Sequence, residues 1–243
     1  MALPFRVDAK NALPLSRFAL QEAGRFLWDR LRGAPPRVEQ ALAFARAHAR
    51  GGDPEAVLAA LDRFGRERSF LMNVGDRKGE ILDAEVLRLR PTRALEIGAY
   101  CGYSAVRIAR LLREWGGRLV SLEASAENAR VARAMVELAG LAGLVDLRHA
   151  KAEEAIPSLS APFDLVFLDH WKDLYLPDLL RLEQHALLRR GSVVVADNVW
   201  LFDASAYFAH VRGSGRYDSR NVASTVEYRD ELPDAVEIST FRG

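Results

Sequence analysis

The pattern of apolar and polar positions along the chain changes near Pro91. Before that residue, apolar side chains recur every three or four positions among charged ones, which is typical of amphipathic helices. Pro35 and Pro36 separate two such segments. Asp53 and Pro54 provide an N-cap and a first-turn proline for a third. The expected helices cover residues 15–33, 38–50 and 53–69, and a fourth helix is expected to follow Lys78.

Beyond Pro91, short β-rich segments alternate with longer helical stretches. The segments are ALEIG, RLVSLE, VDLRHA, FDLVFLD and SVVVAD. This alternation predicts a parallel sheet wrapped by helices. Residues 163–168 and 192–196 are apolar through most of their length, so we place these two strands in the middle of the sheet, where helices cover both faces.

The last fifth of the chain lacks a long helix and contains two candidate strands, near residues 223–228 and 235–241. We expect a charged, proline-containing turn to join them as an antiparallel pair. The predicted fold is therefore α/β and Rossmann-like, with a mostly parallel seven-stranded sheet, helices on both faces, an antiparallel C-terminal strand pair and extra N-terminal helices. We expect residues 1–50 to form a helical extension packed on the body, and residues 51–243 to form one domain.

Composition narrows the class of partner. Lysine and arginine total 34 against 33 aspartate and glutamate residues, so a net charge of +1 provides no field to gather nucleic acid or an anionic membrane. We expect a small-molecule partner. The single cysteine, Cys101, excludes an intrachain disulfide. No segment reaches the roughly 20 apolar residues that span a bilayer, and none resembles a signal peptide, so we expect a cytoplasmic protein without a membrane span.

The first expected helix carries basic residues on its outer face. Membrane-surface anchors and partner-binding helices have this pattern, but we favour packing on the body of the protein. The same helix, over residues 15–32, also has the potential to dock on a second copy. A monomer and a weak homodimer therefore both stay open.

The first strand-to-helix junction, LEIGAYCGYS, has glycines at a G-x-x-x-G spacing, Gly98 and Gly102. Glycine there lets the backbone approach a ligand closely. Glu96 precedes the turn and suits the ammonium group of S-adenosylmethionine, which has no phosphate for helix amides to bind. Glu123 ends the second strand, where this fold class uses a carboxylate for ribose hydroxyls. The alternative is that both glycines serve only the turn and that Glu123 is a solvated strand end.

A second group of polar residues follows two neighbouring strands. Asp169 ends the fourth expected strand, and Asp197 and Asn198 end the fifth. Because adjacent parallel strands deliver their carboxyl ends to one crevice, we expect these three side chains to meet. Two carboxylates and an amide oxygen suit Mg²⁺, whereas dispersed histidines and a lone cysteine argue against a zinc site. The alternative for either aspartate alone is a helix cap.

His170, Trp171 and Lys172 follow Asp169 directly. A lysine beside a dication has its neutral form favoured, so Lys172 is a candidate general base that takes a hydroxyl proton. Its alternative is a surface position at the start of the next helix. For His170, local hydrogen bonding and cofactor contact stay open alongside catalysis.

Several of these segments resemble those of animal catechol O-methyltransferases. The matching stretches are LEIGAYCGYSAVRIARLL, MNVGDRKGEILD, VFLDHWKDLYLPD, LLRRGSVVVADNV and FAHVRGS. They occur in the same order, with nearly the same spacing, from about Phe70 to the C-terminus. The combination of DHWKD, ADNV and EIGAYCGYS is much more specific than a generic methyltransferase glycine motif.

The resemblance implies an S-adenosylmethionine-dependent, Mg²⁺-dependent catechol O-methyltransferase, with residues 51–243 as the methyltransferase domain. It implies that Asp169, Asp197 and Asn198 bind Mg²⁺, that Lys172 is the general base, and that Glu227 accepts a hydrogen bond from the second catechol hydroxyl. The residues implied to line the cofactor site are Met72, Val74, Glu96, Tyr100, Ser104, Glu123, Asp169, His170 and Trp171. The residues implied to contact the substrate are Phe70, Trp171, Lys172, Asn198, Phe202 and Glu227.

Two substrate-contacting positions depart from the family pattern. Phe70 stands where the animal enzymes have a tryptophan, and Phe202 stands where they have a proline. The identity of the catechol and the choice between its meta and para hydroxyls therefore stay open. Residues 1–33 match the family poorly.

Three alternatives to a catechol O-methyltransferase stay open. One is an O-methyltransferase for another vicinal diol, such as a caffeoyl or flavonoid compound. The second is a non-catalytic methyltransferase-like protein with an assembly or trafficking role, although such a role does not require Asp169, Lys172, Asp197 and Asn198 together. A nicotinamide dehydrogenase is disfavoured because the chain lacks G-x-G-x-x-G.

Overall fold

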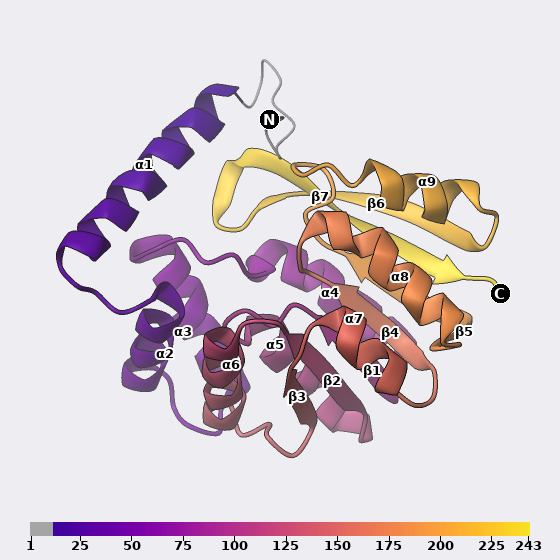
Figure 1. Ribbon diagram of the computed structural model, residues 1–243. Coiled ribbons are helices and arrows are strands. Elements are labelled where there is room, and N and C mark those ends of the chain that lie inside the picture. Colours follow the sequence, from indigo (N-terminus) through magenta and orange to yellow (C-terminus); the bar gives the residue numbers. More distant parts are fainter. Residues whose placement is uncertain (1–11) are drawn as a thin grey trace.

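A seven-stranded sheet forms the centre of the computed structural model, which describes residues 12–243 (Figure 1). Its strand order is β3-β2-β1-β4-β5-β7-β6. The strands are β1 (Arg93–Ile97), β2 (Arg118–Glu123), β3 (Val145–His149), β4 (Phe163–Leu168), β5 (Leu188–Ala196), β6 (Tyr217–Val226) and β7 (Arg229–Phe241). The first five are parallel, and β7 pairs antiparallel with both β5 and β6. The fold predicted from the sequence is confirmed, including the central place of β4 and β5.

Helices cover both faces of this sheet. They are α1 (Ala12–Leu31), α2 (Arg37–His48), α3 (Pro54–Glu67), α4 (Gly75–Leu89), α5 (Tyr103–Leu112), α6 (Ala126–Leu138), α7 (Ala152–Ala155), α8 (Tyr175–Gln184) and α9 (Ser205–Gly213). Short 3₁₀ turns are η1 (Arg113–Trp115), η2 (Ile156–Ser158) and η3 (Lys172–Leu174). Successive residues of β4 point to opposite faces, so Phe167 joins the core under α3 to α6, and Leu168 joins the core under α8 and α9.

The N-terminal helices differ in how closely they pack. Val38, Ala41, Leu42 and Ala45 of α2 are buried, whereas no residue of α1 is. In Figure 1, α1 extends away from the body beside the β6–β7 hairpin. The packing that we favoured for the first helix is therefore limited to one side of it. The first eleven residues of the expected extension lie outside the described residues, and the domain division at residue 50 stays a prediction.

Two element boundaries differ from the sequence-based expectation. Helix α4 begins at Gly75 instead of after Lys78, which places Lys78 on the buried side of its first turn. The C-terminal hairpin turns at Glu227 and Tyr228, and the charged segment containing Pro233 lies within β7. The expected charged turn is therefore wrong: a shift in pairing near Thr225 absorbs this segment as extra residues of β7. Between residues 12 and 243, no helix has the length and apolar character needed to cross a membrane.

Candidate active site

The carboxyl ends of β4 and β5 bring the expected metal ligands together. Leu168 is the register partner of Ala196, and the backbone N–H of Asp197 donates to the carbonyl oxygen of Leu168 at 3.0 Å. Asp169 and Asp197 therefore leave neighbouring strands at the same level. Asn198 has a φ of 52°, a left-handed conformation that asparagine tolerates better than most residues, and it turns the chain out of the sheet.

Burial shapes the electrostatics of both aspartates. Desolvation raises the pKa of Asp169 to about 7, against the opposing effect of Lys172 and Lys78. Desolvation also raises the pKa of Asp197 well above its usual range, although Lys78 opposes it. One oxygen of Asp197, Oδ2, is buried and has no hydrogen-bond partner among the described residues. Buried carboxylates of this kind favour a cation beside them, so the donor set fits a hard divalent metal.

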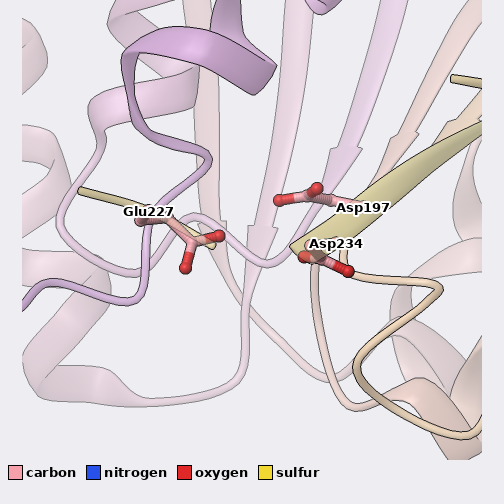
Figure 2. Close-up of side chains that lie close together, drawn as sticks. All are labelled: Asp197, Glu227 and Asp234. Carbon is pink, nitrogen blue, oxygen red and sulfur yellow. The ribbon is translucent and has the colours of Figure 1, made fainter. Parts of the chain in front are cut away.

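Lys78 is a site residue that the sequence analysis missed. Its side chain is 1% exposed, and its Nζ lies 2.9 Å from Asp197 Oδ1, 2.5 Å from Glu227 Oε1 and 3.0 Å from Asp234 Oδ2. Figure 2 shows these three carboxylates lying close together at the end of β5, the β6–β7 turn and β7. The signal in the sequence that could have identified Lys78 was its helical spacing from Leu82 and Glu85. The structure shows all three of these residues buried on one face of α4.

Asp234 is the second residue that was missed. Its Oδ1 accepts the backbone N–H groups of Trp200 and Leu201, at 3.3 and 3.1 Å, and its Oδ2 accepts from Asn198 Nδ2 at 2.8 Å. Burial raises the pKa of Asp234, but the positive charge of Lys78 and these hydrogen bonds outweigh burial and hold the pKa below its usual range. The same amide nitrogen of Asn198 donates to Glu227 Oε1 at 2.9 Å. Asn198 is thus fixed by two carboxylates that come from the C-terminal hairpin.

Lys172 occupies a mostly buried position at the start of η3, with 12% of its side chain exposed. Its Nζ lies 3.5 Å from Asp169 Oδ1 and donates to the Tyr175 hydroxyl at 2.7 Å. The Tyr175 hydroxyl in turn donates a hydrogen bond to the backbone carbonyl oxygens of Leu168, at 2.7 Å, and Asp197, at 3.0 Å. The interpretation of Lys172 as a surface residue is therefore wrong, because its amine faces the same edge as the aspartates.

The glycine loop after β1 lies directly against this edge. Gly98 has a φ of 98°, and a Cβ there would overlap the backbone carbonyl of Asp169. Glu123 Oε2 accepts the N–H groups of Ala99 and Tyr100, at 3.1 and 2.8 Å. Glu123 is therefore buried and orders the loop, and it is not the solvated strand end of the alternative interpretation. Gly102, at a φ of 86°, packs on the backbone of Ala132.

Glu96 is fully buried below the loop and accepts a hydrogen bond from Ser121. Desolvation raises the pKa of Glu96 to about 7, the nearby Glu123 adds to the rise, and hydrogen bonds from Ser104 and Ser121 oppose it. A buried carboxylate with this pKa has its charged form restored by a cationic ligand. Glu96 and Ser104 therefore lie where an ammonium-bearing cofactor can be bound.

The remaining expected cofactor residues fall into different environments. His170 Nε2 lies 2.9 Å from Asp178 Oδ2, so local hydrogen bonding accounts for one ring nitrogen. Trp171 is 73% exposed, and Val74 is buried in the core. Met72 and Tyr100 line an open cavity of about 790 Å³. The structure therefore does not bring all of these expected residues to one cavity.

Helix α1 forms one wall of that cavity, which the sequence did not indicate. Phe18 packs edge-on against Phe70, with ring centroids 4.9 Å apart, and Glu22 pairs with Arg37 at 2.6 Å. Phe70 and Phe202, the two expected substrate walls, belong to one apolar cluster with Phe18. The mouth of the candidate site is therefore built partly from the N-terminal helix.

Comparison with known proteins agrees with this arrangement. A methyltransferase domain family model matches residues 95–199. Catechol O-methyltransferase from Mus musculus is 42% identical over 84% of this chain and 78% of its own length, and catechol O-methyltransferase B from Danio rerio is 45% identical over 85% and 80%.

The chain belongs to the catechol O-methyltransferase family. The resemblance noted in the sequence is confirmed, and the protein is an O-methyltransferase. Among solved structures, the O-methyltransferase TomG from Streptomyces achromogenes, determined in complex with S-adenosylmethionine, is similar with a TM-score of 0.66 at 26% identity. That match covers 76% of this chain and 89% of TomG.

Proposed function

We propose that this member of the catechol O-methyltransferase family transfers the methyl group of S-adenosylmethionine to one hydroxyl of a catechol, with Mg²⁺ bound by Asp169, Asp197 and Asn198. The observation that carries the proposal is the meeting of these three residues with Lys172 at the carboxyl edge of the sheet. The glycine loop lies in direct contact with the same edge. Cofactor and acceptor sites are therefore neighbours.

The charge of the site supports a dication. Two ammonium groups face four carboxylates at this edge, and the six residues are Lys78, Lys172, Asp169, Asp197, Glu227 and Asp234. When all are ionised, two negative charges remain, which a divalent cation neutralises. Mg²⁺ prefers oxygen donors and, when bound, would supply a positive charge that orients both catechol oxygens and lowers the pKa of one hydroxyl.

The chain's own groups then move the proton. Lys172 Nζ is held by Tyr175 and lies on the Asp169 side. Once the ammonium has released its own proton to solvent, the neutral amine takes the proton of one catechol hydroxyl. Glu227 has one oxygen bound by Lys78 and Asn198, and its other oxygen accepts a hydrogen bond from the second hydroxyl. Proximity and orientation of the resulting oxygen nucleophile toward the sulfonium methyl account for the transfer.

Methyl transfer to 3,4-dihydroxybenzoate tests the proposal. Product should form with Mg²⁺ and S-adenosylmethionine, and excess EDTA should abolish it. A protein that binds S-adenosylhomocysteine but methylates no catechol would contradict the proposed substrate, and activity unaffected by EDTA would contradict the metal. Size-exclusion chromatography of the full chain distinguishes the monomer from the weak homodimer, and a cytoplasmic location stays a prediction.

One observation favours a second substrate class. The cavity of about 790 Å³ beside Phe70 has room for a large apolar ring substituent, as in a flavonoid-type vicinal diol. A panel that compares kcat/KM for 3,4-dihydroxybenzoate, a caffeoyl ester and a flavonoid catechol decides between them. A preference for the flavonoid of at least about tenfold, equivalent to about 1.4 kcal/mol, would favour this second class.

The phenylalanine walls should control which hydroxyl is methylated. Replacing Phe70 with tryptophan, the residue of the animal enzymes, enlarges the wall that Phe18 packs against. We expect the meta-to-para product ratio to change by about threefold or more, which needs less than about 1 kcal/mol of differential binding. Chromatography of the two methylated products measures the ratio. Phe208→Trp, on α9, is the matched control, and an equal change in both variants would exclude a role for Phe70.

The raised pKa of Glu96 predicts a pH-dependent cost to stability. Because the folded state binds a proton that the unfolded state releases between about pH 4.5 and 7, stability should fall as pH rises through this range. The pKa difference corresponds to about 3 kcal/mol, so wild type should lose up to that amount relative to Glu96→Gln. Urea unfolding of both proteins at about pH 5 and pH 8 measures this difference.

The same carboxylate should couple cofactor binding to pH. An ammonium group favours ionised Glu96, so the Kd for S-adenosylhomocysteine in wild type should fall as pH rises toward about 7. Isothermal titration of Glu96→Gln should show weaker binding without this pH dependence. Parallel pH profiles for the two proteins would refute the assignment of Glu96 to the cofactor.

A further inference from the structure

Lysine is rare in this chain and is concentrated at the site. Only four of the 34 basic residues are lysines, at positions 10, 78, 151 and 172, and the others are arginines. Lys78 is among the largest fully buried side chains of the described residues. A lysine at a fully buried position of an arginine-rich chain raises the question of what a compact ammonium does there that a guanidinium cannot.

The surroundings of Lys78 show why an ammonium fits. Its Nζ has three protons, and three carboxylate oxygens lie within 2.5 to 3.0 Å of it. These oxygens belong to Asp197, Glu227 and Asp234, from three separate segments around the first turn of α4. A planar guanidinium cannot direct donors to three points clustered around one atom.

Without a cation among them, these carboxylates would form a rival metal site. Their oxygen atoms all lie within 4.8 Å of one another, and all three side chains are buried. Only Asp197 belongs to the proposed Mg²⁺ set. Glu227 is needed for the substrate, and Asp234 already accepts two backbone N–H groups.

We propose that Lys78 is a positioning residue that keeps Glu227 and Asp234 from ligating the metal, and so directs the cation to Asp169, Asp197 and Asn198. The inference rests on the proposed Mg²⁺-dependent function. Lys78 also holds Oε1 of Glu227, which leaves the other carboxylate oxygen for the substrate. Its removal adds one negative charge to the site and frees two further ligands.

The variant Lys78→Met tests this role through metal affinity. With S-adenosylhomocysteine present, Mn²⁺ titration followed by electron paramagnetic resonance should show a Kd for Mn²⁺ about tenfold lower than in wild type. The reason is that the Lys78 ammonium no longer offsets the negative charge of the buried carboxylates. The kcat for catechol methylation should fall by about 100-fold, because the oxygen nucleophile and Glu227 lose their alignment. Lys151→Met, at an exposed lysine, is the matched control.

Two further variants separate charge from position. In Lys78→Met/Asp234→Asn, the charge of the site returns to its wild-type value, so the Mn²⁺ Kd should return to within about twofold while kcat stays low. Lys78→Arg keeps the charge but cannot make the three contacts, so its kcat should stay low as well. These variants also keep the inference testable if Lys78→Met does not fold.

Unchanged or weaker Mn²⁺ binding by Lys78→Met, with S-adenosylhomocysteine binding intact, would overturn the role of Lys78 alone. Wild-type kcat in Lys78→Arg would do the same. Absence of Mn²⁺ binding by the wild-type protein would overturn the proposed metal site and this inference with it.

Discussion

Replacing Lys172 with alanine is expected to lower kcat for catechol methylation by about 10²- to 10⁴-fold, the usual contribution of a positioned general base. The amine lies 3.5 Å from Asp169 Oδ1 and is fixed by the Tyr175 hydroxyl, so no other described lysine can take its place at this edge without displacing Lys78 from its own three carboxylates. Initial rates with saturating S-adenosylmethionine, Mg²⁺ and 3,4-dihydroxybenzoate measure the loss.

Lys151→Ala is the matched control for this prediction, because its ammonium is exposed and pairs only loosely with Glu153 at 4.0 Å. It should leave kcat unchanged. The Kd for S-adenosylhomocysteine should be the same in wild type, Lys172→Ala and Lys151→Ala, which excludes a general loss of structure. A Lys172→Ala protein with wild-type kcat would show that metal and orientation alone suffice for deprotonation.

Replacing Gly98 with alanine is expected to abolish binding of S-adenosylhomocysteine and to destabilise the fold. The added Cβ overlaps the carbonyl of Asp169, and the backbone at Gly98 has a φ of 98° that disfavours any side chain. Strain and overpacking together should lower the free energy of unfolding by about 3 kcal/mol or more. Urea unfolding and isothermal titration measure the two effects.

Gly116→Ala separates the two contributions. Gly116 also has a positive φ, of 76°, but a Cβ there meets no atom within 4 Å. Its substitution should cost only about 1 kcal/mol, from backbone strain alone, and should leave cofactor binding intact. Equal losses of stability in the two variants would mean that the close contact between Gly98 and the backbone of Asp169 does not affect the free energy of unfolding.

The sequence predicted the positions of site residues correctly where those residues follow strands directly. A parallel strand order with short helical crossovers leaves few ways to arrange β4 and β5, so Asp169 and Asp197 had to meet. Glu227 was placed by resemblance alone. Its position at the hairpin turn depends on where the pairing of β6 and β7 shifts, and the sequence pattern near Thr225 does not specify this shift.

The residues that complete the site come from distant segments. Lys78 and Asp234 are 156 positions apart in the chain, yet they are joined by a hydrogen bond of 3.0 Å. The sequence analysis began the fourth helix after Lys78, so it identified neither the buried helical position of Lys78 nor the carboxylates opposite. Phe18 likewise contacts Phe70 only because α1 lies beside the β6–β7 hairpin.

By itself, the sequence determined the sheet, its central strands, the glycine loop and the pair of aspartates, because alternating hydrophobicity and strand ends are local properties of the chain. It also determined the family, through motifs that occur in order. Only the tertiary structure decided the charge balance around Asp197 and the contribution of α1 to the mouth of the site. These features depend on packing between segments far apart in the chain, which no local pattern records.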